Sequence, residues 1–304
     1  MHTIFAKAAP FIYRNARPLD LARFQYHFEG GSQAAVLQCL SYYQNADGGF
    51  GHALEADAWN PHSAPIQTWT ATEILREINC TDAAHPIMQG ILRYLTSEQD
   101  FDGTVWQNVV KSNNDYPHAP WWTAGDKGTS HEDYNPTACL AGFLIRFAAQ
   151  DSVGFALGCR IAQESYAQLM RAEQNDMHTL ACYIRLYEYC KEAGVADVID
   201  LAAMEQRLIT QVKNCITQDL AEWESSYICK PSQFFNTPDS VFYQDNCELA
   251  AYECTYIARK QMDDGTWDIP WDWGAYPEEW AIAKSWWKAT VIINNLLYLR
   301  GMQK

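Results

Sequence analysis

The sequence has little positive charge and no long apolar stretch. Its 304 residues include 22 Lys and Arg but 37 Asp and Glu, which gives a formal net charge of -15. Nucleic acid is therefore not an expected partner, because a polyphosphate backbone is bound through Lys and Arg that displace its counterions. No run approaches the ~18 apolar residues that cross a bilayer, so we expect no transmembrane segment.

Several familiar site motifs are absent as well. The sequence lacks a Walker loop, a Gly-x-Gly-x-x-Gly, a His-Glu-x-x-His and a Gly-x-Ser-x-Gly. We therefore expect no cofactor and leave the need for a divalent metal open. No Cys-x-x-Cys pair occurs, and ten cysteines spread through helix-like segments are typical of reduced thiols. The first 20 residues contain Pro10 and no sustained apolar run, unlike a secretory signal, so we expect a cytoplasmic protein.

Aromatic side chains and one repeated pattern are what the sequence has in abundance. It contains 12 Trp, 17 Tyr and 12 Phe. Three segments, 44–50, 99–106 and 261–267, read Gln-x-x-Asp-Gly followed by an aromatic residue. The second copy begins 55 positions after the first, and the third begins 162 positions after the second, close to three such intervals. This spacing predicts five to six structural units.

Each unit is predicted to be a helical hairpin. Apolar residues at helical spacing precede the first copy, as Val36, Leu37 and Leu40 illustrate. The Asp-Gly step then ends the helix, because glycine accepts left-handed geometry and Asp favours turns. Further helices are predicted over residues 65–78, 139–147, 160–170, 178–192, 201–216 and 279–300. Such hairpins either stack as an open solenoid or close into a ring around a cavity.

The repeats resemble the QW motifs of squalene and oxidosqualene cyclases and the repeats of protein prenyltransferase β subunits. The resemblance implies an all-α fold, with residues 1–304 forming a single α/α toroid domain of five to six hairpins. It also implies an isoprenoid, a small hydrophobic substrate, in an aromatic-lined central cavity. The repeat residues themselves are expected to be structural, because a Gln side chain can bond the backbone end of a neighbouring helix.

Two polar loops carry the candidate chemistry. The first, residues 51–62, contains two carboxylates and two imidazoles, a combination that favours a general acid, and a solvated loop is the alternative. The second, residues 118–138, ends in Asp-Tyr-Asn-Pro-Thr-Ala at residues 133–138, ahead of an apolar helix. We predict Pro136 in the first turn of that helix and Asn135 as its cap. Capping acids in solvent are the alternative to a catalytic role.

Residues 133–138 are similar to the Asp-x-Asp-Asp-Thr-Ala motif that class II terpene cyclases carry at a helix start. In those enzymes the middle Asp protonates an alkene. Asn135 stands at that position here, and an amide does not donate a proton as a carboxylic acid does. The resemblance therefore leaves proton donation to Glu55, Asp57 or Asp133, which we predict as the catalytic acids.

Ligand-binding side chains are predicted in both loops and in an aromatic loop at residues 267–280. They are His52, Trp59, Trp121, Trp122, His131, Trp271, Trp273 and Tyr276. Packing between hairpins is the alternative role for the aromatic ones. Asp245 and Cys247 with a distant His178 are similar to the zinc ligands of prenyltransferases, although in reversed order along the chain. Helix capping by Asp245 or Asn246 is the alternative there.

Three functions are compatible with these features. The first is a terpene-cyclase-like or prenyltransferase-like enzyme whose loop carboxylates protonate an isoprenoid. The second is a glycan-processing α/α barrel, a hydrolase or lyase with sugar rings stacked on Trp side chains. The third is a non-catalytic toroid that binds a peptide or a partner helix. The sequence does not indicate an oligomeric state.

Overall fold

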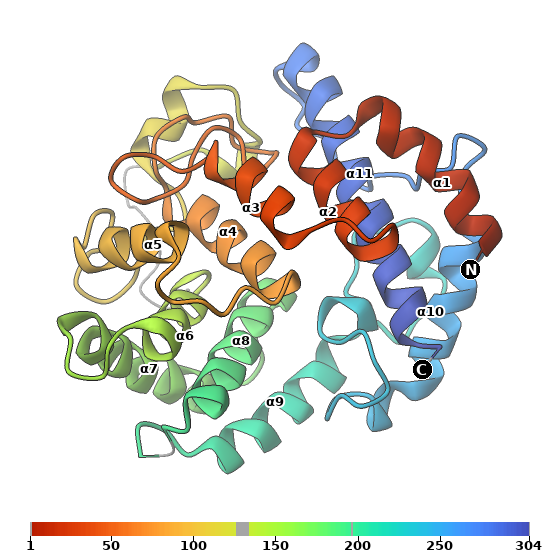
Figure 1. The fold of residues 1–304 in the computed structure, drawn as a ribbon. Coiled ribbons are helices and arrows are strands. Elements are labelled where there is room, and N and C mark those ends of the chain that lie inside the picture. Colours follow the sequence, from red (N-terminus) through yellow and green to blue (C-terminus); the bar gives the residue numbers. More distant parts are fainter. Residues whose placement is uncertain (1, 126–133, 196, 304) are drawn as a thin grey trace. The chain divides into compact units, whose positions relative to one another are not determined.

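A computed structural model describes residues 2–125, 134–195 and 197–303 (Figure 1). The described residues form eleven α-helices and five short 3₁₀ segments. Their β pairing consists of three isolated bridges. The predicted all-α fold is confirmed.

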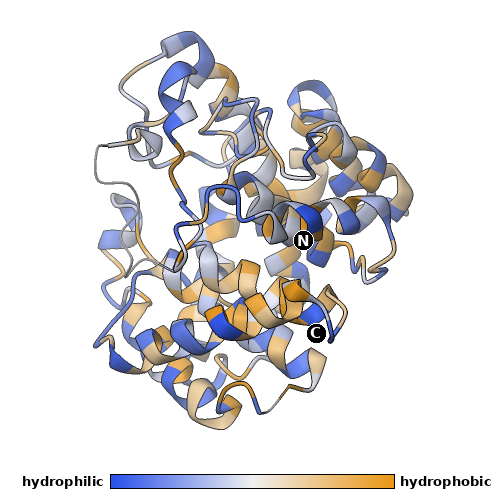
Figure 2. Cartoon of the chain, turned by 90° about the vertical axis from the view of Figure 1, so that its left-hand side faces the viewer, coloured by the Kyte–Doolittle hydropathy of each residue, from blue (hydrophilic) through white to orange (hydrophobic). Residues whose placement is uncertain are grey.

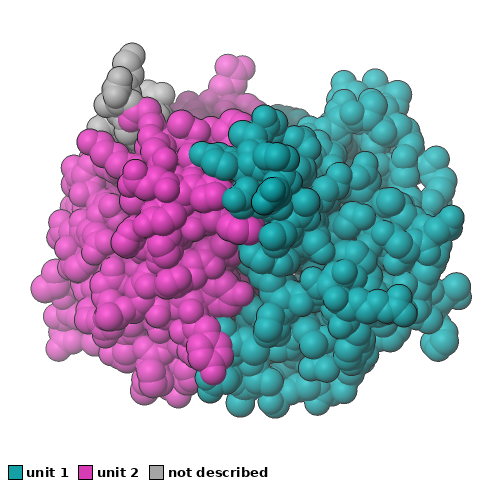
Figure 3. Space-filling model, turned by 90° about the horizontal axis from the view of Figure 1, so that it is seen from above, with its two compact units in different colours: residues 1–39, 212–304 teal, residues 40–211 magenta. Residues whose placement is uncertain are grey.

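The chain forms two compact units, residues 1–39 with 212–304 (unit 1) and residues 40–211 (unit 2) (Figure 3). Unit 1 contains α1 (His2–Asn15), α2 (Pro18–Phe28), η3 (Glu222–Glu224), η4 (Pro231–Gln233), η5 (Gln244–Asn246), α10 (Cys247–Lys260) and α11 (Pro277–Gly301). Unit 2 contains α4 (Pro65–Glu77), α5 (Pro86–Thr96), η1 (Lys111–Asp115), η2 (Pro120–Trp122), α6 (Thr137–Phe147), α7 (Val153–Arg171) and α8 (Met177–Ala193). Two further helices, α3 (Gln33–Ser41) and α9 (Leu201–Cys215), each begin in one unit and end in the other.

Each predicted helix corresponds to a helix of the structure, and local signals fix the ends. At the start of α7, Ser152 Oγ accepts from Phe155 N at 3.1 Å. At the start of α8, Asp176 Oδ1 accepts from His178 N at 2.8 Å. Helix α8 ends at Ala193 and is capped by Gly194, whose φ of +69° suits glycine.

Many of the helices carry both apolar and polar residues (Figure 2). Such a mixture is typical of helices that bury one face and expose the other. Within the described ranges, no helix combines the length and the apolar character needed to cross a membrane.

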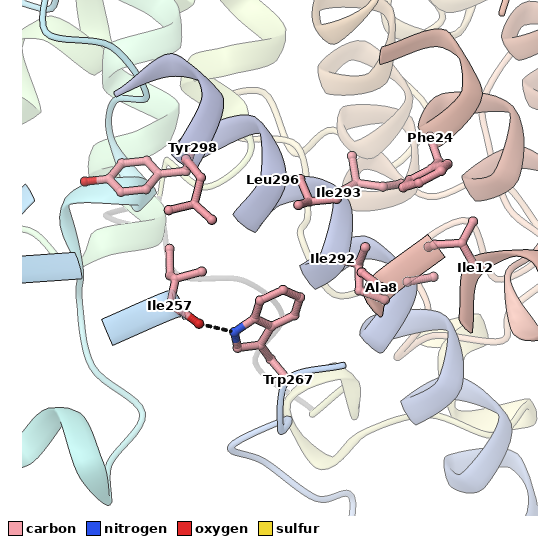
Figure 4. Packing of buried hydrophobic residues seen from close by; sticks show 11 residues of the cluster. Ala8, Ile12, Phe24, Ile257, Trp267, Ile292, Ile293, Leu296 and Tyr298 are labelled. Atoms are coloured by element: carbon pink, nitrogen blue, oxygen red, sulfur yellow. Dashed lines mark hydrogen bonds between the residues drawn. The ribbon is translucent and has the colours of Figure 1, made fainter. Parts of the chain in front are cut away.

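The core of unit 1 joins its first and last helices around an aromatic residue of the third repeat. Trp267 is 5% exposed and belongs to one cluster with Ala8 of α1 and Ile292 of α11 (Figure 4). Its indole N–H donates to Ile257 O of α10 at 2.8 Å. Burial of such a side chain contributes about 1.5 to 3 kcal/mol. The repeat aromatic thus joins α1, from the start of the chain, to α10 and α11 near its other end.

The first repeat binds its turn to the start of α5 through main-chain atoms. Gln44 Nε2 donates to Gly48 O of its own turn at 2.9 Å and to Ile87 O of α5 at 3.0 Å. Gly48 has a φ of +98°, and a Cβ built on it would lie 2.1 Å from Gly90 O. The turn therefore contacts α5 at two carbonyls three positions apart.

The third repeat makes the same contacts with α1. Gln261 Nε2 donates to Gly265 O at 3.1 Å and to Ile4 O at 2.9 Å. Gly265 has a φ of +87°, and a Cβ built on it would lie 2.0 Å from Lys7 O. Again the two helix carbonyls are three positions apart. The expected structural role of the repeat Gln is confirmed for these two copies.

The second repeat is built differently, and Gln99 makes no such contact with a described helix. Its side chain is exposed and hydrogen-bonds Asp100, whereas Gly103 O accepts from Arg160 Nη1 of α7 at 3.1 Å. The reason is a shorter turn. The bridge from Phe101 to Trp106 spans one residue fewer than the Gln44–Phe50 bridge, so Gln99 lies ahead of the turn.

Between α7 and α8 a buried amide replaces the missing motif. Gln211 of α9 is fully buried, and its Nε2 donates to Ala172 O at 3.1 Å. Its Oε1 accepts from Asn175 Nδ2 at 2.7 Å and from Asn175 N at 3.1 Å. One side chain therefore satisfies the backbone at a helix end, as the repeat Gln does elsewhere.

We expect Gly48→Ala and Gly265→Ala to lower the free energy of unfolding by more than ~3 kcal/mol, because the added Cβ meets helix backbone that cannot move aside. Gly103→Ala is the matched control. Its φ is +100°, but no atom of the described residues lies within 4 Å of the place that its Cβ would take. It should lose only ~1 kcal/mol, the backbone cost alone. Urea unfolding measures the stability of all three variants. Equal losses of unfolding free energy would contradict the close approach of Gly48 and Gly265 to helix backbone.

Gln44→Ala should lower the free energy of unfolding by about 1 to 2 kcal/mol, because Ile87 O and Gly48 O both lose a donor. Gln99→Ala should change it by less than about 0.5 kcal/mol, as at exposed surface positions. The same unfolding experiment compares the two. A larger loss of unfolding free energy in Gln99→Ala than in Gln44→Ala would contradict the assignment of the stabilising helix contact to the first repeat.

Candidate functional site

The first predicted loop is buried. Glu55 is 8% exposed and Asp57 is 3% exposed, so neither carboxyl group lies in a solvated loop. Burial of an ionisable group requires partners that compensate for the lost water. Both residues belong to unit 2, in the connection between α3 and α4.

An amide side chain of α4 holds this loop from within. Gln67 is fully buried; its Oε1 accepts from Leu54 N at 2.9 Å, and its Nε2 donates to Asn60 O at 3.0 Å. Pro65 begins α4, which suits the first helical turn and lets Gln67 point back into the loop. The backbone on both sides of the two acids is therefore fixed to a rigid helix.

A second loop closes over the first from the outside. Trp59 N donates to Pro117 O at 3.0 Å, and Ala119 N donates to Asp57 O at 2.8 Å. Asn60 Nδ2 adds contacts to Ser112 Oγ at 2.7 Å and to Asn113 Oδ1 at 3.0 Å. These bonds reproduce a short piece of sheet without forming a regular strand.

His118 belongs to this closing loop. Its Nδ1 lies 2.7 Å from Tyr116 O and its Nε2 lies 3.0 Å from Thr123 Oγ1. The ring is therefore held at both nitrogens. In the sequence His118 is only the first residue of the second polar loop, because its contacts appear only after the two loops meet.

The backbone just before the acids is strained. His52 and Ala53 have φ values of 60° and 59°, and neither is glycine. Residues with side chains in this left-handed region are uncommon and cluster at functional sites. His52 itself is exposed, and its Nε2 lies 2.9 Å from Asn45 Oδ1 in the first repeat. The predicted ligand residue is thus tied to the repeat turn.

The tryptophans predicted in these loops differ in their surroundings. Trp121 is 45% exposed. Trp59 is partly buried, and its indole N–H donates to Ala56 O at 3.1 Å. Trp122 packs against Ile66 and Val110, and its buried indole N–H has no acceptor among the described residues. Trp121 and Trp122 are the two that leave atoms for a ligand. His131 and Asp133 lie outside the described residues.

The aromatic loop predicted at residues 267–280 belongs to unit 1. Trp273 is 1% exposed and its ring packs at a tilt against Trp280 with a centroid distance of 5.6 Å, so it is a packing residue in this structure. Trp271 is partly buried, with its ring edge-to-face against Trp287 at 5.3 Å. Tyr276 is 39% exposed directly ahead of α11.

The predicted cap of α6 is wrong. The helix begins at Thr137, Pro136 occupies the cap position, and no described side chain makes a capping bond there. The Asn135–Pro136 peptide bond is cis. Asn135 Oδ1 accepts from Cys182 Sγ of α8 at 3.5 Å, so the amide is engaged across the interior and not at the helix start.

Sequence reasoning missed a polar cluster formed by α4, α6 and α8. Glu73 and Arg185 form a two-pronged ion pair, with Nε–Oε1 at 2.9 Å and Nη2–Oε2 at 2.6 Å. Cys139 Sγ donates to Glu73 Oε1 at 3.5 Å. Burial raises the pKa of the Cys139 thiol well above its usual range, and the Glu73 carboxylate adds to the shift. Cys139 therefore acts as a neutral donor and not as a nucleophile.

This cluster continues into a charge-balanced row. Arg76 Nη2 lies 3.0 Å from Glu188 Oε2 and 2.7 Å from Glu192 Oε1, and Arg146 Nε lies 3.4 Å from Glu192 Oε2. Burial raises the pKa of Glu192, but the two guanidinium groups outweigh it and hold the pKa below its usual range. Paired charges of this kind join helices and leave no excess charge for a ligand.

The predicted zinc residues are distributed over both units. Asp245 and Cys247 belong to unit 1, where Asp245 Oδ2 lies 3.8 Å from Lys213 Nζ, and His178 belongs to unit 2. Asn246 occupies the cap position of α10, but its side chain makes no capping bond and Nδ2 donates to Phe242 O at 2.7 Å. No three His, Cys, Asp or Glu side chains of the described chain gather as a metal ion requires.

Comparisons with family models, with curated proteins and with solved structures find no match to this chain. The functional interpretation therefore depends on the site geometry and on the resemblance of the repeats.

We expect Arg185→Met to lower the free energy of unfolding by about 1 to 3 kcal/mol, because Glu73 loses its partner; the two side chains are 23% and 28% exposed, which reduces the loss. Adding Glu73→Leu should recover part of it. Asp263→Asn, which breaks the exposed pair with Lys7 at 3.4 Å, is the control and should change little. If the double variant lost as much unfolding free energy as Arg185→Met and Glu73→Leu lose together, the two side chains would not be coupled.

Proposed function

We propose that the protein is an α/α toroid enzyme, similar to terpene cyclases and prenyltransferases, that binds an isoprenoid and protonates it with a loop carboxyl group. The proposed donors are Glu55 and Asp57. The observation that carries the proposal is that both carboxyl groups are buried in a loop that Gln67 holds from one side and the loop around Pro117 from the other.

The repeats support the terpenoid lineage. Gln44 and Gln261 tie their turns to a helix start in the same way in the two units. The third copy joins the C-terminal part of the chain to α1, with 257 positions between the bonded residues. A ring of hairpins requires such a link between its last and first members, whereas an open solenoid ends in capping units.

The fixed loop suits a proton donor. Glu55 O accepts from Ala58 N at 3.1 Å, and Asp57 O accepts from Ala119 N at 2.8 Å, so the backbone that carries each acid is held by a hydrogen bond. A general acid acts best when it is oriented and shielded from water. Asn135 has no carboxyl group at the position that the cyclase motif uses, which leaves the loop acids as donors.

Trp122 is linked to Asp57 through two main-chain hydrogen bonds. Trp122 N donates to Ala119 O at 2.9 Å, and Ala119 N donates to Asp57 O. The Trp122 ring packs on the apolar side chains of Ile66 and Val110. An aromatic face next to an acid stabilises the positive charge that a protonated alkene carries. Apolar neighbours favour a hydrocarbon over a sugar at this place.

Thermal-shift measurements with isoprenoid alcohols, isoprenoid diphosphates and oligosaccharides test the ligand class. An isoprenoid at ~100 times its dissociation constant should stabilise the fold by ~2.7 kcal/mol. Stabilisation by an oligosaccharide alone would contradict the proposal that the ligand is an isoprenoid. The ligand would then be a glycan, and Glu55 and Asp57 would become candidates for the acids of glycoside hydrolysis.

The role of the acids is tested with the isoprenoid that binds. Glu55→Gln or Asp57→Asn should lower turnover at least ~100-fold while the thermal shift by ligand persists, because the amide keeps the shape and loses the proton. Asp115→Asn, at an exposed position of η1, is the matched control and should keep full turnover. Full turnover in both loop variants would remove these acids from the mechanism.

A further inference from the structure

Two cysteines of unit 1 face each other across the base of an exposed loop. Cys215 is the last residue of α9, and Cys229 precedes η4. Each carries a thiol, and the two side chains are in hydrogen-bond contact. Thr217 N donates to Cys229 O at 3.0 Å, which holds the two backbone segments side by side.

Residues 218–227, between these cysteines, form a loop with a single buried anchor. Most of residues 218–227 are exposed, whereas Trp223 is 1% exposed. Its indole N–H donates to Thr217 O at 3.0 Å, and Tyr256 Oη of α10 donates to Trp223 O at 2.5 Å. The loop is therefore anchored through Trp223, while Cys215 lies at the last residue of α9 and Cys229 lies outside any helix.

Other neighbouring thiols lack this arrangement. Cys139 and Cys182 interact electrostatically, but each donates its hydrogen to a different acceptor, Glu73 or Asn135. Cys159 and Cys190 also influence each other, but they lie in the middle of α7 and near the end of α8. Disulfide geometry requires close sulfur atoms and Cα atoms within about 7 Å of each other. Cys159 and Cys190 lie on two different helices, whereas Cys229 lies outside any helix.

The two thiols differ in reactivity. The hydrogen bond to Cys215 and burial raise the pKa of the Cys229 thiol, which is 7% exposed. Cys215 is the more exposed of the two. The negative charge of Glu253 raises the pKa of Cys229 further, and the positive charge of the neighbouring Lys230 lowers it by a smaller amount. These observations make Cys215 the attacking sulfur and Cys229 the resolving one.

We propose that Cys215 and Cys229 form a reversible disulfide by exchange with a low-molecular-weight disulfide such as oxidised glutathione. The Cys215 thiolate attacks one sulfur of oxidised glutathione, breaks its S–S bond and releases one glutathione thiolate. Cys229 then loses its proton and attacks the Cys215 sulfur, which releases the second glutathione. The protein loses two electrons, the glutathione disulfide gains them, and the two thiol protons end on the two glutathiones. This site is independent of the proposed isoprenoid chemistry.

The test incubates the full-length protein in glutathione buffers of increasing oxidised fraction and maps cross-linked peptides by mass spectrometry without reduction. The Cys215–Cys229 cross-link should form at a lower oxidised fraction than any other pair, and reduced glutathione should remove it. The melting temperature should rise by several degrees on oxidation, because the bond constrains the unfolded chain. Formation of a Cys159–Cys190 cross-link first would overturn the proposal.

Two single variants test the assigned roles. Cys229→Ser should accumulate a glutathione adduct at Cys215, because no second thiol resolves it. Cys215→Ser should gain no adduct at the buried Cys229. The reverse pattern, or adducts at neither cysteine in the wild type and both variants, would overturn the assignment. Melting curves of the reduced variants confirm that each is folded, and the wild-type cross-link map decides the question if one is not.

Discussion

The structure depends on a close approach between the backbone of a turn and the backbone of a helix. Gly48 and Gly265 bring their turns so near to a helix that no Cβ fits, and Gln44 and Gln261 fasten the contact with one amide. The candidate site is built on the first of these turns. Asn45 Nδ2 donates to Pro61 O at 3.0 Å, and the exposed His52 contacts the same Asn45 side chain. The position of the loop acids thus follows from the packing of a glycine against α5.

In this protein, amide side chains form the hydrogen bonds to buried loop backbone that neighbouring strands form in other folds. Long connections can be buried only if their backbone polar groups find partners. Gln67 supplies them for the loop around Glu55, and Gln211 does so for the end of α7. Asn60 extends the same role to a second loop. An amide side chain both donates and accepts hydrogen bonds. One such side chain therefore replaces two of the main-chain hydrogen bonds that a neighbouring strand would supply, while the backbone remains irregular.

The parts of the structure that could be predicted are those encoded by neighbouring residues. Apolar periodicity and a proline at the first turn are sufficient for α4, and closeness in sequence is sufficient to single out Glu55 and Asp57. The Glu73–Arg185 pair was not predictable in this way, because 112 positions separate its members and nothing local marks either one. Asn135 was misassigned as a cap for a related reason: its side chain meets Cys182 of a later helix. The second repeat differs because its bridge is one residue shorter, a change that the shared Gln-x-x-Asp-Gly letters conceal.

The repeat contact has a consequence for how the order of the hairpins is specified. Its partner atoms are carbonyl oxygens, which every helix possesses, and the helix residues involved have nothing in common: Ile87 and Gly90 in α5, Ile4 and Lys7 in α1. The contact therefore sets the distance and direction between two elements without selecting which elements meet. Which elements meet is determined by the connectivity of the chain and by the packing of large core residues such as Trp267. If a hairpin were duplicated within such a chain, the Gln and Gly of its turn could contact the carbonyl oxygens of the neighbouring helix at once. No side chain of that helix would first have to change.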